Sequence, residues 1–281
     1  GTEVEIPLNE KDLIDVYNGI KNIDAKNFIN DLLYYRTIFD RFIVKATDEE
    51  NDEENYRWTL KKPYKYYYDK RNTNSLKFEN TFDSQERLIK SISLLQVTFR
   101  NRKYKNWLQE ILHYFSDKNK FKVTDVEYQT NLDGIILSYF DTNINKANYD
   151  QGVKVPHFLF NFIDYLYWVK KPSSFNFKFT YRNSVEHHLA QYFSNPIQDN
   201  LGNLCLVSKS SNSKMNNESP VGKADCSSAG KYYKSGNIPP KQKVMYDLTN
   251  HNGKWEDKAI MEHKKAVITL LDSRVDILNH S

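Results

Sequence analysis

Apolar residues recur at helical spacing over most of the first two thirds of the chain. They lie three or four positions apart in a series of stretches, which predicts helices that each bury one face. The stretches cover residues 13–20, 28–43, 88–99, 107–115, 135–140 and 157–169. The last of them follows Pro156 and stops before Lys170-Lys171-Pro172, where proline prevents the helix from continuing. We therefore expect residues 1–172 to form a helical scaffold and connector.

The pattern changes after Pro172. Phenylalanines at 175, 177 and 179 alternate with polar residues, which indicates a half-buried strand running on toward residue 188. A second short apolar run, Leu204–Val207, follows a turn-like segment and predicts a partner strand. Helical spacing returns from Trp255 to Ile277. The prediction is an α+β fold of two unequal lobes, residues 1–172 and 173–281.

Composition limits the class of protein. The 281 residues are 39% hydrophobic and include 16 Phe and 20 Tyr. That is enough apolar side chain to bury a core, so a disordered chain is excluded. No run approaches the ~18 apolar residues of a membrane span, and no basic-then-apolar leader is present. We expect a cytoplasmic protein without a membrane partner, and the Gly1-Thr2 start indicates a fragment of a longer chain.

The cysteine content and the charge distribution restrict the class of protein less than the composition does. The two cysteines make neither a disulfide framework nor a CxxC zinc site. Residues 1–60 carry 14 acidic against 7 basic residues, so the remainder supplies the net positive charge of +4. An acidic run at 48–54 is expected to be a solvated loop. A lysine-rich window at 204–243 would suit a polyanion, although on charge alone an ordinary surface is the better interpretation.

One group of residues has the chemistry of a hydrolytic site. Glu186 and His187 are adjacent near a predicted strand end, and Asn212 follows later. A carboxylate and an amide oxygen are hard ligands suited to Mg²⁺, and an imidazole can take a proton from water near neutral pH. This set fits metal-assisted phosphodiester hydrolysis. His188 follows directly, so the residues alone leave open which imidazole is active.

The same region resembles a known family. The run Phe179–Gln191, followed by Leu201–Val207 and Ser211–Ser213, resembles the HNH (ββα-metal) nuclease domain of GmrSD-type proteins. These are bacterial anti-phage and modification-dependent restriction proteins, and the chain is also similar to the SspE nucleases of phosphorothioate-linked defence. Segments 93–99 and 104–108 resemble the helical segment that joins the two domains of that family, and 157–168 resembles the helix just before the nuclease strand. The resemblance covers roughly residues 85–270 and is most specific over 175–223.

The resemblance implies a small HNH lobe that acts as a DNA endonuclease with Mg²⁺, or with Mn²⁺ in its place. Glu186 then corresponds to the first metal-binding acid, His187 to the general base and Asn212 to the second metal ligand. Asn203 matches the residue of the catalytic motif that braces the loop beneath the active site. The implied partners are DNA and an N-terminal ParB-like nucleotide-binding domain that is absent from this chain.

Three basic residues are expected to contact DNA. Lys214 and Lys223 lie, by position and charge, where a basic side chain could hold the scissile or a flanking phosphate, and Arg182 is counted with them. The sequence also departs from the family pattern. Ala190 replaces a proline, His188 replaces an apolar or aromatic residue, and Glu262-His263 stands where an arginine is usual.

Two other interpretations stay open. One is a catalytically degenerate nucleic-acid-binding or regulatory module. The departures allow a degenerate domain, and binding would rest on the lysines of 204–243 and on the tyrosines of the 64–68 run, which could stack on bases. Packing of that run between helices or against lysine stems is the more ordinary expectation. The other is a helical protein–protein scaffold that has neither a metal nor DNA.

Overall fold

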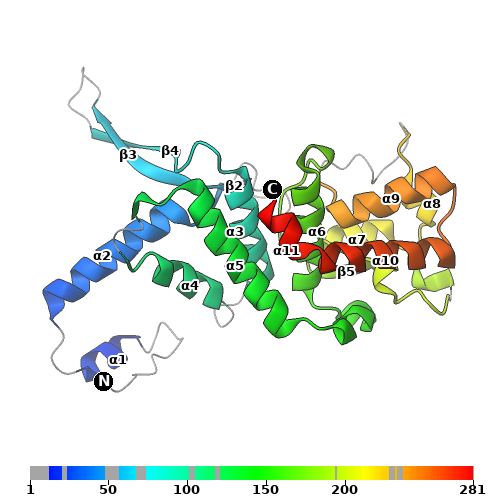
Figure 1. Ribbon diagram of the computed structural model, residues 1–281, viewed down its shortest axis with the longest axis horizontal. Helices are drawn as coiled ribbons and strands as arrows, with labels where there is room; N and C mark the ends of the chain where they lie inside the picture. Colours follow the sequence, from blue (N-terminus) through cyan, green and yellow to red (C-terminus); the bar gives the residue numbers. More distant parts are fainter. Residues whose placement is uncertain are drawn as a thin grey trace.

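The computed structural model describes residues 13–20, 24–47, 57–67, 74–100, 105–117, 121–193, 195–227, 232 and 237–280. Within these residues the protein is mostly helical with three antiparallel strand pairs, so the α+β class is confirmed. The molecule is elongated (Figure 1), with the N-terminal helices and hairpins at one end and a smaller C-terminal lobe at the other. Helices α3 (Glu86–Thr98) and α6 (His157–Lys170) lie between them.

The predicted helices of the scaffold are confirmed. They are α1 (Leu13–Gly19), α2 (Ala25–Phe42), α3, α4 (Asn106–Tyr114), α5 (Asp125–Asn143) and α6. Asp24 caps α2 by accepting hydrogen bonds from the first-turn amides. Thr124 and Glu127 form a capping box at the start of α5. Almost every residue of α6 is buried, because its apolar side chains surround the whole helix.

Residues 45–80 contain strands that the helical prediction omitted. Strand β1 (Lys45–Thr47) pairs with β2 (Arg57–Thr59), and β3 (Lys61–Tyr67) pairs with β4 (Asn74–Asn80). Lysine and tyrosine alternate over much of β3, and tyrosine favours strands. The tyrosine run therefore lies in a hairpin, with Tyr64 half exposed. Tyr68 and the acidic run at 48–54 lie outside the described residues.

The strand predicted at Phe175–Phe179 is wrong. Its alternation is real, since Phe177 and Phe179 are buried and Lys178 is exposed, but the segment is not part of any described sheet. Side chains satisfy its backbone instead. Lys90 donates to the Phe177 carbonyl, and the Trp58 indole donates to the Phe179 carbonyl at 2.7 Å. Period-two burial shows an extended backbone, and only a neighbouring strand turns that into a sheet.

The C-terminal lobe begins with the strand that follows. Strand β5 (Ser184–His187) pairs antiparallel with β6 (Leu204–Val207), which places Glu186 opposite Cys205. Helix α7 (Lys209–Met215) comes directly after β6. The lobe is completed by four helices: α8 (Pro220–Ala224), α9 (Pro240–Asn252), α10 (Asp257–Asp272) and α11 (Arg274–Asn279). Short 3-10 turns at Gln191–Phe193 (η6) and Leu201–Asn203 (η7) lie between the two strands.

The largest buried apolar cluster extends across the boundary at residue 172. It contains scaffold residues such as Ile92 and Phe162 together with Leu204 and Leu271 of the C-terminal lobe. Helices α10 and α11 bring the C-terminus back to the middle of the molecule beside α6 (Figure 1). None of the helices in the described part of the chain has the length and apolar character that a bilayer crossing requires.

Candidate active site in the C-terminal lobe

A surface hollow of about 450 Å³ lies between strand β5 and helix α7. Glu186, His187 and Asn212 all line it, so the fold brings together three residues that the sequence placed in one site. The arrangement follows from connectivity. Strand β6 pairs with β5 and leads straight into α7, so the helix lies against the strand that carries Glu186.

Glu186 is a buried carboxylate with one oxygen engaged. Glu186 is only 5% exposed, and its Oε1 accepts a hydrogen bond from Lys223 Nζ at 2.6 Å. Burial raises the pKa of Glu186, and the charge and hydrogen bond of Lys223 oppose that rise. The backbone N–H of His187 also donates to this carboxylate. No described side chain donates to Oε2, so this oxygen is the one that could take a ligand from the hollow.

His187 is oriented by a carboxylate. Its Nε2 lies 2.7 Å from Asp199 Oδ1. A carboxylate oxygen accepts hydrogen bonds, so this contact favours the tautomer that carries the hydrogen on Nε2 and leaves the lone pair on Nδ1. Among the described residues Nδ1 has no hydrogen-bond partner, and it is not one of the buried unpaired atoms. Water can therefore reach the basic nitrogen of this imidazole.

His188 lies away from the hollow. It is 1% exposed, its Nε2 is 2.7 Å from Thr249 Oγ1, and its ring packs against Tyr246 and Trp255. Burial lowers its pKa well below the ordinary value, so it is a neutral core residue. Of the two neighbouring imidazoles, His187 is the one that lines the hollow.

Asn203 is fully buried and fully hydrogen bonded. Its Oδ1 accepts from the Leu189 amide at 2.8 Å and from the Trp255 indole at 3.0 Å. Its Nδ2 donates to the Leu189 carbonyl at 3.0 Å and to the Gln198 carbonyl at 2.8 Å. The side chain thus ties together the two ends of the loop that follows His187. It does not line the hollow, so its position is that of a brace.

Asn212 presents one oxygen to the same space. It lies on α7, whose start is capped by Ser208, and its Nδ2 donates to Ser184 Oγ at 2.6 Å. That bond orients the amide so that the nitrogen faces strand β5. No described residue donates to Oδ1, which is not sealed from solvent. Asn212 therefore offers a fixed carbonyl oxygen beside Glu186.

The three expected DNA contacts take different positions. Lys223 is 1% exposed and bonds Glu186 and the carbonyl of His187, so it lies inside the lobe. Arg182 is also buried, donates to the Asn237 carbonyl at 3.1 Å and packs over the ring of Phe177.

Lys214 is exposed on α7 but is not one of the residues that line the hollow. Lys209, at the start of the same helix, does line it. Lys209 was not predicted as a site residue, because it is one of seven lysines in the window 204–243 and nothing in the sequence distinguishes it from the others.

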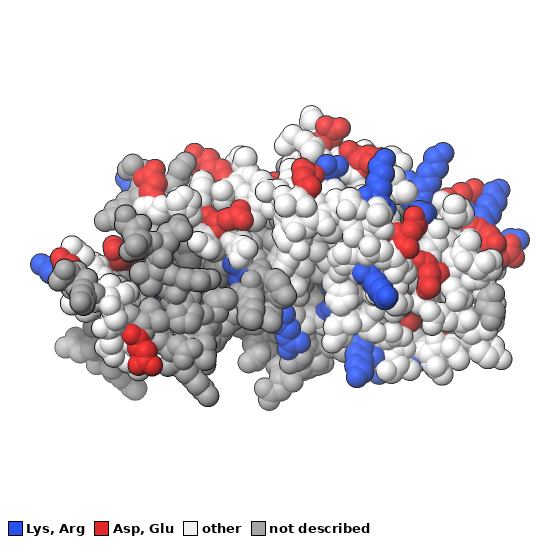
Figure 2. Space-filling model, turned by 90° about the horizontal axis from the view of Figure 1, so that it is seen from below, with Lys and Arg blue, Asp and Glu red and all other residues white. Residues whose placement is uncertain are grey.

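The lysine window is less basic at the surface than its sequence indicates. Lys223 and Lys241 are both 1% exposed, and Lys241 donates to the carbonyl oxygen of Leu201. Two more of the lysines, at 231 and 234, lie outside the described residues. On the face shown in Figure 2, basic side chains over the C-terminal lobe are interspersed with acidic ones. This face is therefore of mixed charge.

The oxygens of the hollow fit a hard cation. No group of three or more His, Cys, Asp and Glu side chains suited to a metal occurs in the described ranges. Glu186 Oε2 and Asn212 Oδ1 remain as two protein oxygens. Mg²⁺ usually keeps several waters and takes other ligands from substrate phosphates, so two protein oxygens are sufficient for it. Metals that need thiolates or several imidazoles do not fit this set.

The scaffold contributes to the site as well. Gly152, on a 3-10 turn at Gly152–Lys154 (η4), has a φ of +56° and approaches Asp199 so closely that a Cβ would lie 3.0 Å from its Cγ. The next residue, Val153, lines the hollow. Asp199 was not predicted, because it lies twelve residues beyond His187 in a loop without periodicity. The tertiary structure places this loop beside both η4 and the imidazole.

Comparisons of the chain with protein-family models, with curated proteins and with solved structures return no match. The family resemblance therefore rests on the motif residues themselves, and the function has to be argued from the geometry of the hollow.

Proposed function

We propose that the protein is a metal-dependent DNA endonuclease whose active site is the hollow between β5 and α7. The observation that carries the proposal is the convergence of three residues on one hollow: His187, Glu186 and Asn212, each with a side-chain acceptor atom that no described side chain occupies. A base beside two hard oxygens is the arrangement that phosphodiester hydrolysis requires. The order strand, strand, helix supports the HNH (ββα-metal) arrangement that the motif residues suggest.

His187 is the general base of the proposed reaction. Its Nδ1 takes a proton from the attacking water, and the positive charge that forms on the ring is stabilised by Asp199 at Nε2. Asp199 also prevents the ring from turning, so the lone pair keeps its direction. Asp199 is thus a positioning residue, and the scaffold turn at Gly152 holds it in place.

Glu186 and Asn212 are the protein ligands of the proposed Mg²⁺, for which Mn²⁺ can substitute. When bound, the ion neutralises charge on the phosphate and on the 3′ leaving oxygen. Lys223 fixes the Glu186 carboxylate, and Asn203 braces the loop after His187. One such site cuts one strand at a time. The resemblance to GmrSD-type proteins implies that the natural substrate is invading or modified DNA, selected by a ParB-like partner domain.

The test is cleavage of a supercoiled plasmid with Mg²⁺ or Mn²⁺, followed as nicked and linear products. We expect His187→Ala to lower the rate about 10²- to 10⁴-fold, the usual contribution of a general base. Asp199→Asn should cause a smaller loss. The matched control is His251→Ala, which removes an exposed imidazole on α9 and should cut like the parent. If His187→Ala cuts as fast as the parent, the assigned base is wrong.

One observation favours a second candidate, a nucleic-acid-binding or regulatory module without catalysis. The ammonium of Lys223 lies 2.6 Å from Glu186, so it already compensates the charge that a cation would need. Such a module would hold DNA equally well in the presence of a chelator and would not bind Mn²⁺. A parent protein that is inert with every divalent metal, yet binds DNA, would favour this candidate over the endonuclease.

A further inference from the structure

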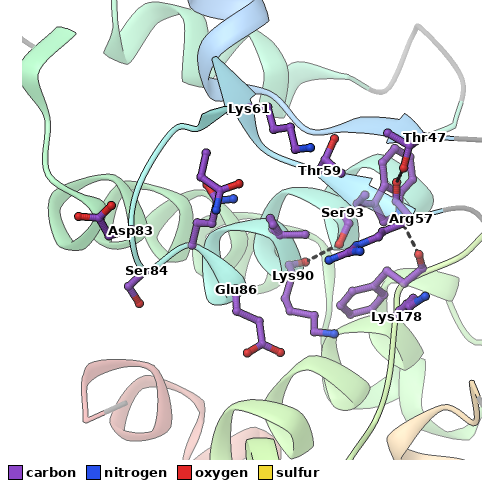
Figure 3. A pocket seen from close by; sticks show the side chains of 15 residues that line it. Thr47, Arg57, Thr59, Lys61, Asp83, Ser84, Glu86, Lys90, Ser93 and Lys178 are labelled. Carbon is purple, nitrogen blue, oxygen red and sulfur yellow. Dashed lines mark hydrogen bonds between the residues drawn. The ribbon is translucent and has the colours of Figure 1, made fainter. Parts of the chain in front are cut away.

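A second cavity, of about 710 Å³, lies where strands β1 to β3 and the start of α3 face residues 178–179 (Figure 3). It shares no lining residue with the hollow. Its walls are fixed by two buried side chains. Trp58, 8% exposed, bonds the Phe179 carbonyl, and Lys90, 9% exposed, bonds the Phe177 carbonyl. The cavity therefore lies where the scaffold is hydrogen bonded to the segment that leads into the C-terminal lobe.

The cavity is lined by more positive than negative charge. Arg57, Lys61, Lys90 and Lys178 face it from four different segments, against Asp83 and Glu86. In the described part of the chain, Arg57, Lys61 and Lys178 form no ion pair. In the view of Figure 3, Asp83 lies at the end away from Arg57 and Lys178. Among the described residues, the lining of this cavity therefore carries two more positive than negative side chains.

Lys90, which also lines the cavity, is a further positive charge that no carboxylate contacts through a hydrogen bond among the described residues. Burial lowers its pKa to about 8, Glu86 opposes that change, and the charge of Lys178 adds to it. The ammonium is held by a carbonyl oxygen and by the faces of Trp168 and Phe177. No described carboxylate hydrogen-bonds to it. An anion in the cavity would therefore relieve the repulsion between Lys90 and Lys178.

Polar side chains complete the lining. Ser84, Gln85 and Glu86 form the entry to α3. The hydroxyls of Thr59 and Ser93 also line the cavity and donate to the carbonyls of Lys45 and Lys90. The guanidinium of Arg57 and the ammonium groups of Lys61 and Lys178 are the donors that can bind phosphate oxygens.

We propose that this cavity is a phosphate-binding site, filled by the phosphates of a nucleic-acid strand or by those of a free nucleotide. Its volume lies in the range that holds a nucleotide-sized ligand. The site does not depend on catalysis in the hollow. A strand bound here would be anchored at the junction of the two lobes.

The test measures binding by the full-length chain carrying His187→Ala, in a chelator, so that cleavage plays no part. The probes are inorganic tripolyphosphate, ATP and a fluorescent DNA duplex. The site variant is Lys61→Ala/Lys178→Ala, and the matched control is Lys258→Ala/Lys265→Ala on the exposed face of α10. We expect tripolyphosphate to bind the parent and the control, and to bind the site variant at least about tenfold more weakly.

The other probes separate the two sources of phosphate. If the strand is the ligand, DNA affinity falls in the site variant and the slope of log affinity against log salt drops by about two. If a nucleotide is the ligand, ATP binding falls while DNA binding stays at the level of the control. Absence of tripolyphosphate binding by the parent would overturn the proposal, and so would equal binding by the site variant and the control. Loss of plasmid cleavage alone would bear only on the hollow.

Discussion

The ammonium group of Lys223 meets three acceptors at the end of strand β5. It lies 2.6 Å from Glu186 Oε1, 2.7 Å from the His187 carbonyl and 3.3 Å from the His188 carbonyl, and the residue is 1% exposed. An ion pair buried to this extent costs much desolvation, and each partner depends on the other. Lys223 therefore sets the position of the proposed metal ligand and of the strand end that carries the base.

This coupling can be measured by unfolding in urea. Lys223→Met should lower the free energy of unfolding by about 3–5 kcal/mol, because it leaves the Glu186 carboxylate buried without its counter-charge. The double variant Glu186→Gln/Lys223→Met should recover part of that loss, with a coupling energy of about 0.5–3 kcal/mol. The control is Lys254→Met in the exposed pair Lys254–Glu256, which should cost about 1 kcal/mol or less. Strictly additive single effects would contradict the coupling.

Among the elements, the 3-10 turn η7 packs tightly against a helix. Gly202 lies against α10, and a Cβ there would be 2.1 Å from the Ile260 carbonyl oxygen and 2.9 Å from the Lys264 amide nitrogen. Both neighbours are backbone atoms of a helix and cannot rotate away. Because Asn203 is the next residue, the packing of α10 on this turn also positions the side chain that braces the loop after His187.

Gly202→Ala should therefore destabilise the protein by about 1–3 kcal/mol or more, since the turn and α10 must separate. It should also reduce plasmid cleavage by displacing Asn203. Gly134→Ala is the matched control, because Gly134 is exposed on α5 and nothing lies within 4 Å of its added Cβ. There the change should stabilise by about 0.5–1 kcal/mol. Thermal unfolding distinguishes the two, and an equal midpoint for both variants would refute the packing argument.

For the whole molecule, a buried histidine makes stability depend on pH. His263 is 1% exposed and donates from Nδ1 to the Gly202 carbonyl at 2.6 Å. Burial lowers its pKa from 6.5 to about 3, with Lys241 adding to the effect and the Gly202 hydrogen bond opposing it. Between these two values the unfolded chain binds a proton that the folded chain does not. The stability from neutral His263 is complete above pH 6.5 and is lost as the pH falls toward 3.

Urea unfolding at several pH values tests this sign. This one group should lower the free energy of unfolding by up to about 1.4 kcal/mol per pH unit below pH 6.5. His263→Gln should be less stable at neutral pH but should lose less stability on acidification. A variant whose acid slope equals that of the parent would show that other groups account for the loss.

Some helices of the scaffold were predicted from the sequence with small errors at their ends, whereas α5 begins ten residues before the predicted stretch 135–140, and α7, α8 and α9 were not predicted. The stretch 157–169 became α6 at His157–Lys170, and 107–115 became α4 at Asn106–Tyr114. The spacing of apolar side chains that signals a helix lies within the helix itself, so no distant partner is needed. The strand pairs of residues 45–80 and the extended segment at 175–179 depend on what lies beside them, and there the prediction failed.

The residues of the hollow divide in the same way. Glu186, His187 and Asn212 could be chosen from the sequence because their chemistry is carried by the residue types and by their order along one strand–strand–helix unit. What each can do was decided by distant residues: Asp199 fixes the tautomer of His187, and Lys223 occupies one oxygen of Glu186. Burial removed His188 and Arg182 from the surface. Side-chain type is a local property, whereas burial and hydrogen-bond partners exist only once separate segments pack together.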